Sequence, residues 1–263
     1  MKRLALAIMA LLILGSTWVF AGCSLPGIQV VRASGPATTQ DYDMTGFTSV
    51  DAGSVFHMEI VPSSAFSVSV TSNENMFDYI EVTKSGSTLR LSLKNGISVT
   101  GPLTLDARIS MPEIWGLTLS GAASATANGF STTHDFRLNL SGASSAAIEM
   151  QTGKFTCDIS GASRAEGSLN AGDSNMRLSG AANLGLDGSA GNTTMDVSGA
   201  SNASLSDFMM QDASVTISGG SRASITVNGK LNVNLSGGST LQYAGNPTMG
   251  NVDVTGGSTL QKR

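Results

Sequence analysis

The chain has 263 residues with a formal net charge of -4 at pH 7; 13% of the residues are charged and 41% are hydrophobic. This composition is too apolar for a disordered chain, and 31 glycines are too many for a helical protein. Without the two basic residues at the N-terminus, the chain has 13 basic and 19 acidic residues, and this negative balance argues against a nucleic-acid partner.

The first 23 residues have the features of an export signal. Lys2 and Arg3 give a positive start, an apolar run follows from Leu4 to Gly15, and the segment FAGC ends at Cys23. This ending resembles the lipobox of bacterial lipoproteins. The resemblance implies that residues 1–22 are a cleaved signal peptide and that acylated Cys23 anchors the exported protein to the bacterial cell envelope. An ordinary secretory signal and an uncleaved helical anchor are the alternatives.

The segment after the signal has no period. Residues 24–43 carry Pro26 and Pro36 among scattered serines and threonines. We therefore expect residues 23–43, starting with the lipidated cysteine, to be a flexible tether. The only other cysteine, Cys157, falls in an apolar column of the repeats, so we expect a buried thiol and no disulfide.

Residues 44–115 alternate between apolar and polar residues, as in VFHMEIV, FSVSV, LRLSL and LTLDARISM. Such alternation is typical of half-buried strands. We interpret these segments as irregular early coils that cap one β-helix domain over residues 44–263. A small separate β domain is the alternative.

Residues 116–263 contain eight regular repeats with a period near 19, each centred on Ser or Thr followed by Gly. Apolar columns lie one and three residues before the Ser, with a polar residue between them, and two more lie five and seven residues after it. Each copy therefore holds two short strands. The pattern predicts an all-β fold, a right-handed parallel β-helix (solenoid) with coils of about 19 residues and Ser-Gly corners.

The Ser-Gly pair is predicted to be the corner between the two strands, because glycine reaches positive φ without a Cβ clash. A column of serines three residues after the corner Ser is expected to form a hydroxyl ladder that satisfies corner backbone groups. The corner glycines are Gly121, Gly142, Gly161, Gly180, Gly199, Gly219, Gly237 and Gly256, and the ladder serines are Ser144, Ser163, Ser201, Ser221, Ser239 and Ser258.

The segment that begins FTSVDAGSVFHMEIV at Phe47, followed by repeats with Ser-Gly corners, resembles the head GIN domain family of auto-transporter adhesins. The likeness extends over roughly residues 44 to 260. It implies a fold like that of the pectin-lyase β-helices, no catalytic residues, and a role in cell adhesion for exported, often lipid-anchored proteins.

These features favour a non-catalytic β-helix protein that presents a repetitive polar surface for adhesion or binding at the cell envelope. Its expected partners are the membrane, through the lipid anchor, and a glycan or envelope protein; no cofactor or metal is expected. A structural, self-assembling envelope element that forms homo-oligomers is the alternative.

An enzyme acting on acidic polysaccharides, a lyase or hydrolase, is the rival class, because many parallel β-helices degrade such substrates. The candidate residues are Asp158, Arg177 and Asp196 on successive coils of one outward column, which we interpret as a surface charge arrangement. His57 and His134, the only histidines, lie in different segments, and nothing in the sequence predicts a metal site or a catalytic triad there.

Overall fold

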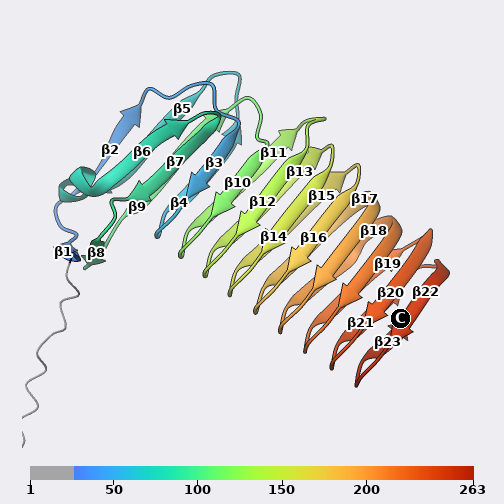
Figure 1. The fold of residues 1–263 in the computed structure, drawn as a ribbon. Helices are drawn as coiled ribbons and strands as arrows, with labels where there is room; N and C mark the ends of the chain where they lie inside the picture. Colours follow the sequence, from blue (N-terminus) through green and yellow to red (C-terminus); the bar gives the residue numbers. More distant parts are fainter. Residues whose placement is uncertain (1–26) are drawn as a thin grey trace, which may run out of the picture.

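The computed structural model describes residues 27–263, so the predicted signal peptide and Cys23 lie outside the described residues. Over this range the chain is a β-solenoid of about 8 turns, with stacked parallel coils about 19 residues apart (Figure 1). The predicted all-β parallel solenoid is therefore confirmed. The one helix of residues 27–263 is a 3-10 helix, η1 (Glu74–Tyr79), and it is neither long nor apolar enough to cross a membrane.

Each regular coil contributes one strand to each of two parallel sheets. Sheet 1 holds the strands that lead into a corner, and sheet 2 holds the strands that follow it. Sheet 1 contains β10 (Gly116–Leu119), β12 (Phe136–Leu140), β14 (Phe155–Ile159), β16 (Ser174–Leu178), β20 (Lys230–Leu235) and β22 (Thr248–Val254). Sheet 2 contains β11 (Ser124–Ser131), β13 (Ser145–Thr152), β15 (Arg164–Ala171), β19 (Arg222–Val227), β21 (Thr240–Ala244) and β23 (Thr259–Lys262). The long strands that belong to both sheets are β17 (Asn183–Val197) and β18 (Asn202–Ile217).

The core lies between the two sheets and is built from equivalent positions of successive coils. Leu138 pairs with Cys157 across β12 and β14, and both side chains are buried. Phe136 and Phe155 stack in the same way, with ring centroids 6.2 Å apart and an interplanar angle of 17°. Burial raises the pKa of the Cys157 thiol to about 12, so this free cysteine stays protonated near neutral pH.

The corners place glycine where both conformation and spacing require it. All eight corner glycines have φ between +68° and +78°. The amide of Ala143 donates to the Gly121 carbonyl at 2.7 Å, and later corners repeat this bond. A Cβ on Gly142 would lie 2.6 Å from the Gly121 carbonyl oxygen, so a side chain there would collide with the preceding corner.

The serine column after the corners is buried except at Ser258 in the last coil, and it forms part of the expected hydroxyl ladder. Ser144 Oγ donates to Ser163 Oγ at 3.3 Å, and Ser239 Oγ donates to Ser258 Oγ at 3.2 Å. Ser221 Oγ is buried without a hydrogen-bond partner in the described part of the chain. The ladder is therefore interrupted at that coil.

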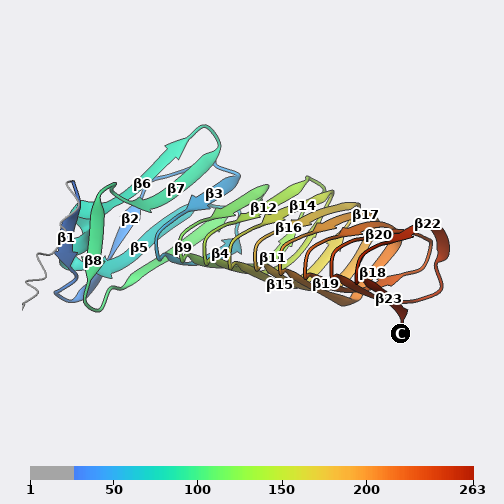
Figure 2. The same cartoon turned by 60° about the horizontal axis from the view of Figure 1, so that its bottom comes forward.

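The N-terminal region continues both sheets, but its coils do not stack in chain order (Figure 2). Strands β3 (Ser49–Ala52) and β4 (His57–Pro62) form a coil that pairs directly with β10 and β11. Strands β7 (Thr88–Leu93) and β9 (Leu105–Met111) lie on the other side of that coil, although they follow it in sequence. The chain then returns past β3 and β4 to begin the regular repeats.

The remaining cap strands are mostly antiparallel. Strand β5 (Ser67–Asn73) pairs antiparallel with β9, and β6 (Ile80–Ser85) pairs antiparallel with β7. The prediction of coils throughout residues 44–115 is therefore wrong for these pairs. A short connection explains the β6–β7 pair, because adjacent strands joined by a tight turn run antiparallel, whereas β5 and β9 are joined only through the intervening segments.

The predicted tether is wrong for residues 29–42, which form two strands of the cap. Strand β1 (Gln29–Arg32) pairs parallel with β8 (Ile97–Thr100), and β2 (Ala37–Tyr42) pairs antiparallel with β5. Pro36 falls just before β2, where its missing amide hydrogen removes no hydrogen bond between β2 and its neighbour. Most side chains of β2 are exposed, so this edge strand carries no apolar alternation in its sequence.

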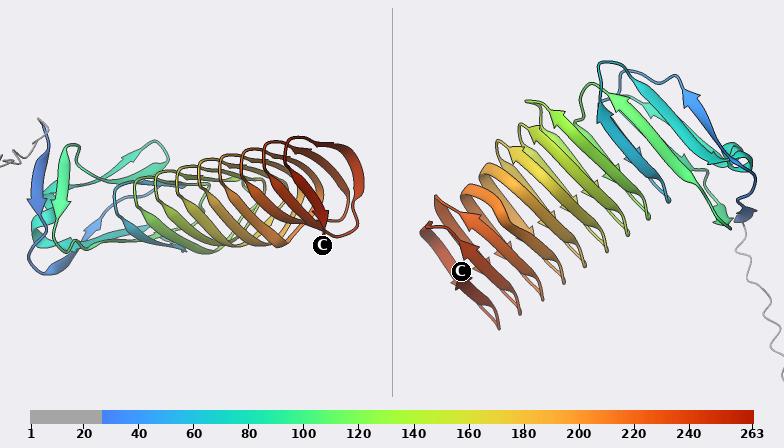
Figure 3. Two further views of the ribbon diagram at one scale, coloured as in Figure 1. Left: turned by 90° about the horizontal axis from the view of Figure 1, so that it is seen from below. Right: turned by 180° about the vertical axis from the view of Figure 1, so that it is seen from behind.

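The C-terminal coil has no strand stacked on its outer side within the described residues (Figure 3). Val252 and Val254 occupy columns that are buried in earlier coils, yet their side chains are 45% and 41% exposed. The end of the solenoid thus presents apolar side chains together with the free edges of β22 and β23.

Candidate functional site

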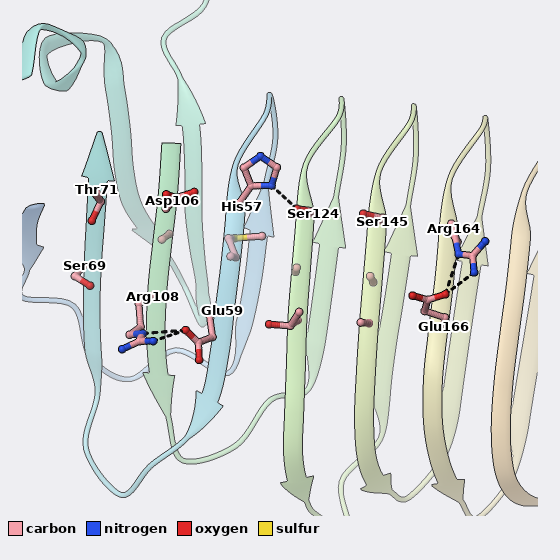
Figure 4. A pocket seen from close by; sticks show the side chains of 16 residues that line it. His57, Glu59, Ser69, Thr71, Asp106, Arg108, Ser124, Ser145, Arg164 and Glu166 are labelled. Atoms are coloured by element: carbon pink, nitrogen blue, oxygen red, sulfur yellow. Dashed lines mark hydrogen bonds and ion pairs between the residues drawn. The ribbon is translucent and has the colours of Figure 1, made fainter. Parts of the chain in front are cut away.

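A groove of about 550 Å³ crosses the outer face of sheet 2 where the cap meets the regular coils (Figure 4). It spans six neighbouring strands in the order β5, β9, β4, β11, β13 and β15. Since outward side chains on paired strands stand in register, the groove is lined by two rows. One row is Thr71, Asp106, His57, Ser124, Ser145 and Arg164, and the other is Ser69, Arg108, Glu59, Thr126, Ala147 and Glu166.

Small residues in the middle of the rows account for the hollow. Ser124 and Thr126 on β11 and Ser145 and Ala147 on β13 leave the sheet surface low between larger side chains at both ends. They occupy columns four and six residues after the corner Ser. The same columns hold Arg164 and Glu166 in the next coil, so the repeat does not require the small residues of β11 and β13.

An arginine–glutamate pair stands at each end of this floor. Arg108 Nη2 lies 2.6 Å from Glu59 Oε2, and Arg164 Nη2 lies 2.5 Å from Glu166 Oε2. All four side chains are at least 49% exposed, so the pairs contribute little to stability and stay accessible to a ligand. Four strand spacings separate β9 from β15, which places Arg108 and Arg164 about 19 Å apart along the groove.

His57 lies beside Ser124 in the middle of the groove, with 2.7 Å between the imidazole Nδ1 and the hydroxyl Oγ. These residues are 67 positions apart in the sequence, and they meet because β4 stacks directly on β11. Asp106 is the register neighbour of His57 on β9, but no hydrogen bond joins them among the described residues. The pair can bind a polar ligand group, but it lacks the oriented carboxylate of a Ser-His-Asp triad.

The residues considered for an enzyme in the sequence lie elsewhere. Asp158, Arg177 and Asp196 stand in register on β14, β16 and β17 of sheet 1 with exposed side chains. Within residues 27–263, Arg177 forms no ion pair within 4.0 Å, and no cluster of three metal-ligating side chains occurs. His134 lies before β12, outside the groove.

Sequence reasoning missed the groove because its rows combine three separate stretches of chain. The residues on β11, β13 and β15 follow the repeat columns and could be aligned from sequence. The residues on β4, β5 and β9 stand in the same rows only because these cap strands stack next to β11, and the sequence does not reveal that order. The outward positions of HMEIV and LDARISM were the available signal, since each presents a charged pair two residues apart or a histidine with a carboxylate.

Solved structures share this architecture. A "putative lipid binding protein" from Parabacteroides distasonis superposes with a TM-score of 0.84 at 17% identity, covering 89% of this chain and 100% of that chain. A "putative adhesin" from Parabacteroides merdae gives a TM-score of 0.82 at 16% identity, covering 89% of this chain and 99% of that chain. A "putative adhesin" from Bacteroides fragilis gives a TM-score of 0.67 at 17% identity, covering 89% of this chain and 100% of that chain. These likenesses show a common fold.

Family membership rests on the sequence itself. No curated protein matches this sequence significantly. The family model described as "Putative auto-transporter adhesin, head GIN domain" matches residues 46–247, which include β4, β9 and all regular coils up to β21. The chain therefore belongs to the head GIN domain family of auto-transporter adhesins.

Proposed function

We propose that the protein is an exported, lipid-anchored adhesin that acts without catalysis and binds an extended ligand in the groove of sheet 2. The observation that carries this proposal is the pair of polar rows, which ends in two accessible arginine–glutamate pairs on a rigid parallel sheet. Membership of the adhesin family supports the same function.

The groove suits a ligand that offers both hydrogen-bond donors and acceptors. Guanidinium and carboxylate groups stand at both ends of a floor that carries hydroxyls, over about 19 Å, a length that fits several sugar or peptide units. The strands beneath are hydrogen-bonded on both sides, so the side chains are held in place before a ligand arrives. One structural neighbour is described as lipid-binding, but the exposed charges here favour a polar glycan or envelope protein over an acyl chain.

A second function, self-assembly at the envelope, is favoured by exposed apolar side chains on β22. Val252 and Val254 are exposed beside two free strand edges, and both features favour contact with another chain. This surface lies on the last coil, whereas the groove ends at β15, so the two functions use separate parts of the solenoid.

The anchor is tested by acyl labelling in the native cell. We expect Cys23→Ser to abolish incorporation of radiolabelled fatty acid and to leave the precursor uncleaved, because the acyl acceptor is lost. Cys157→Ser is the matched control, since its thiol is buried within the fold, and it should be labelled like the parent. Fatty acid on the Cys23→Ser protein would contradict the anchor.

The groove is tested with purified chain from Ser24 to Arg263, which contains the whole described fold, added to isolated cell envelopes. We expect Arg108→Gln with Arg164→Gln to lower the bound fraction about tenfold, because two charge-assisted hydrogen-bonding groups are removed. Arg222→Gln is the matched control, since Arg222 occupies the Arg164 column three coils farther along and lies outside the groove. Equal binding by the double variant and the control would rule out the groove.

A further inference from the structure

A second, smaller hollow lies on the outer face of sheet 1, on the opposite sheet from the groove. It has a volume of about 330 Å³ and spans β7, β3, β10 and β12. Gly116 lies in the floor of the hollow between Ser49 and Arg137 of the same row, and a Cβ there would lie 3.0 Å from Ser49 Oγ. A hollow of this size accommodates one compact ligand unit.

Trp115 stands at the side of this hollow and is 41% exposed. The equivalent position in the next coil is Phe136, which is buried, whereas here Ile114 fills the core and the indole stays outside. The exposed ring is nevertheless held in place: its Nε1 donates to Glu113 Oε2 at 3.0 Å, and its plane stacks on His134 with centroids 4.6 Å apart. A fixed, exposed indole that the core does not need is a platform for a ligand.

The charged side chains that line the hollow are Arg90, Arg137 and Asp51. Arg90 Nη2 pairs with Asp51 Oδ2 at 3.0 Å, which leaves that guanidinium partly compensated. Arg137 is exposed on the neighbouring row and has no ion-pair partner within the described residues. Asp51 is bound to Arg90, and Glu113 at the side of the hollow is bound to the Trp115 indole, so Arg137 is the guanidinium available to a ligand.

We propose that this hollow binds a single acidic sugar, a pyranose that carries a carboxylate, at the end or in the middle of a glycan. The C–H face of a pyranose is apolar and packs on an indole, while its hydroxyls bond to planar carboxylate and guanidinium groups. The free Arg137 guanidinium receives the sugar carboxylate in a charge-assisted, two-point contact. Neither the groove nor the anchor is needed for this site.

The site carries its own reporter, because Trp115 is the sole tryptophan between Ser24 and Arg263. The probes are methyl β-glucuronide and methyl β-glucoside, which differ only in the carboxylate at C6. With the chain from Ser24 to Arg263, we expect the glucuronide to shift Trp115 emission and protect it from acrylamide quenching at millimolar concentration. The glucoside should bind about tenfold more weakly, because it lacks the charged partner of Arg137.

Variants separate this site from the rest of the surface. Arg137→Gln should reduce glucuronide affinity about tenfold and leave glucoside binding unchanged. Trp115→Ala should abolish the binding of both sugars, measured by calorimetry, and should melt at the same temperature as the parent. Arg177→Gln is the matched control, two coils along on the same sheet, and the groove variant Arg108→Gln with Arg164→Gln should also bind normally. The proposal is overturned if neither sugar binds, if both bind equally, or if Arg137→Gln binds like the parent. Loss of binding in the groove variant would also overturn it.

Discussion

Replacing Gly167 by alanine is expected to destabilise the solenoid by about 3–5 kcal/mol. Gly167 has φ of +138°, a region that L side chains rarely adopt. A Cβ there would overlap the carbonyl oxygen of Ile148, its register partner on β13. Both strands are held in the sheet on either side, so neither backbone can move away without breaking ladder hydrogen bonds.

The matched control for this change is Gly185→Ala on the next strand, β17. A Cβ on Gly185 meets nothing within 4 Å, and its φ is not in the positive region. We expect its free energy of unfolding, measured in urea, to stay within about 0.5 kcal/mol of the parent, and the urea midpoint of Gly167→Ala to fall sharply with the same slope. Similar midpoints for the two variants would show that the close approach of the Ile148 carbonyl does not exclude a side chain at Gly167.

Truncation of Phe155 to alanine is expected to cost about 3–5 kcal/mol, because it removes a fully buried ring from the core. Phe155 stacks on Phe136 in the preceding coil, but its neighbour in the following coil is Ser174. Ser174 is occupied in a 2.7 Å hydrogen bond with Thr193 and cannot expand into the void. The cavity would therefore stay largely unfilled.

Thr156→Ala is the control for this second change, since Thr156 is the adjacent residue and points outward from the same strand. We expect it to shift the thermal midpoint by a small fraction of the shift seen in Phe155→Ala. If both variants melt alike, the aromatic stack contributes no more than a surface hydroxyl, and the core between the sheets is looser than its burial indicates.

The regular coils could be predicted from sequence because, in a parallel solenoid, paired positions of successive coils are separated by one constant repeat length. Each inward column is apolar over many copies, and a shift of one residue would expose all of them at once. The corner glycines follow from the same repetition, since every corner stacks on the one before it. The close contact at Gly167 could not be predicted, because a glycine in an inward column can mean either an unfilled space in the core or a close approach of two backbones.

The cap and both candidate sites could not be predicted for a different reason. Strand β2 is stabilised by backbone hydrogen bonds at a sheet edge, and its exposed side chains leave no periodic trace. The stacking order, with β3 between β7 and β10 and β4 between β9 and β11, depends on contacts between distant segments. Only that order brings His57 next to Ser124 and places Asp51 and Trp115 in the lining of one hollow.

Both candidate sites end at or before β15, and the coils beyond it pair mainly with adjacent coils, although Arg263 Nη1 also donates to Ser206 Oγ at 2.7 Å. A duplication or loss of one 19-residue unit in the later part of the rod would leave recognition at the cap end intact. Each such event would change the length of the molecule by about 4.8 Å. The number of distal coils thus sets the length of the rod in steps of one unit, without changing the residues of either proposed site.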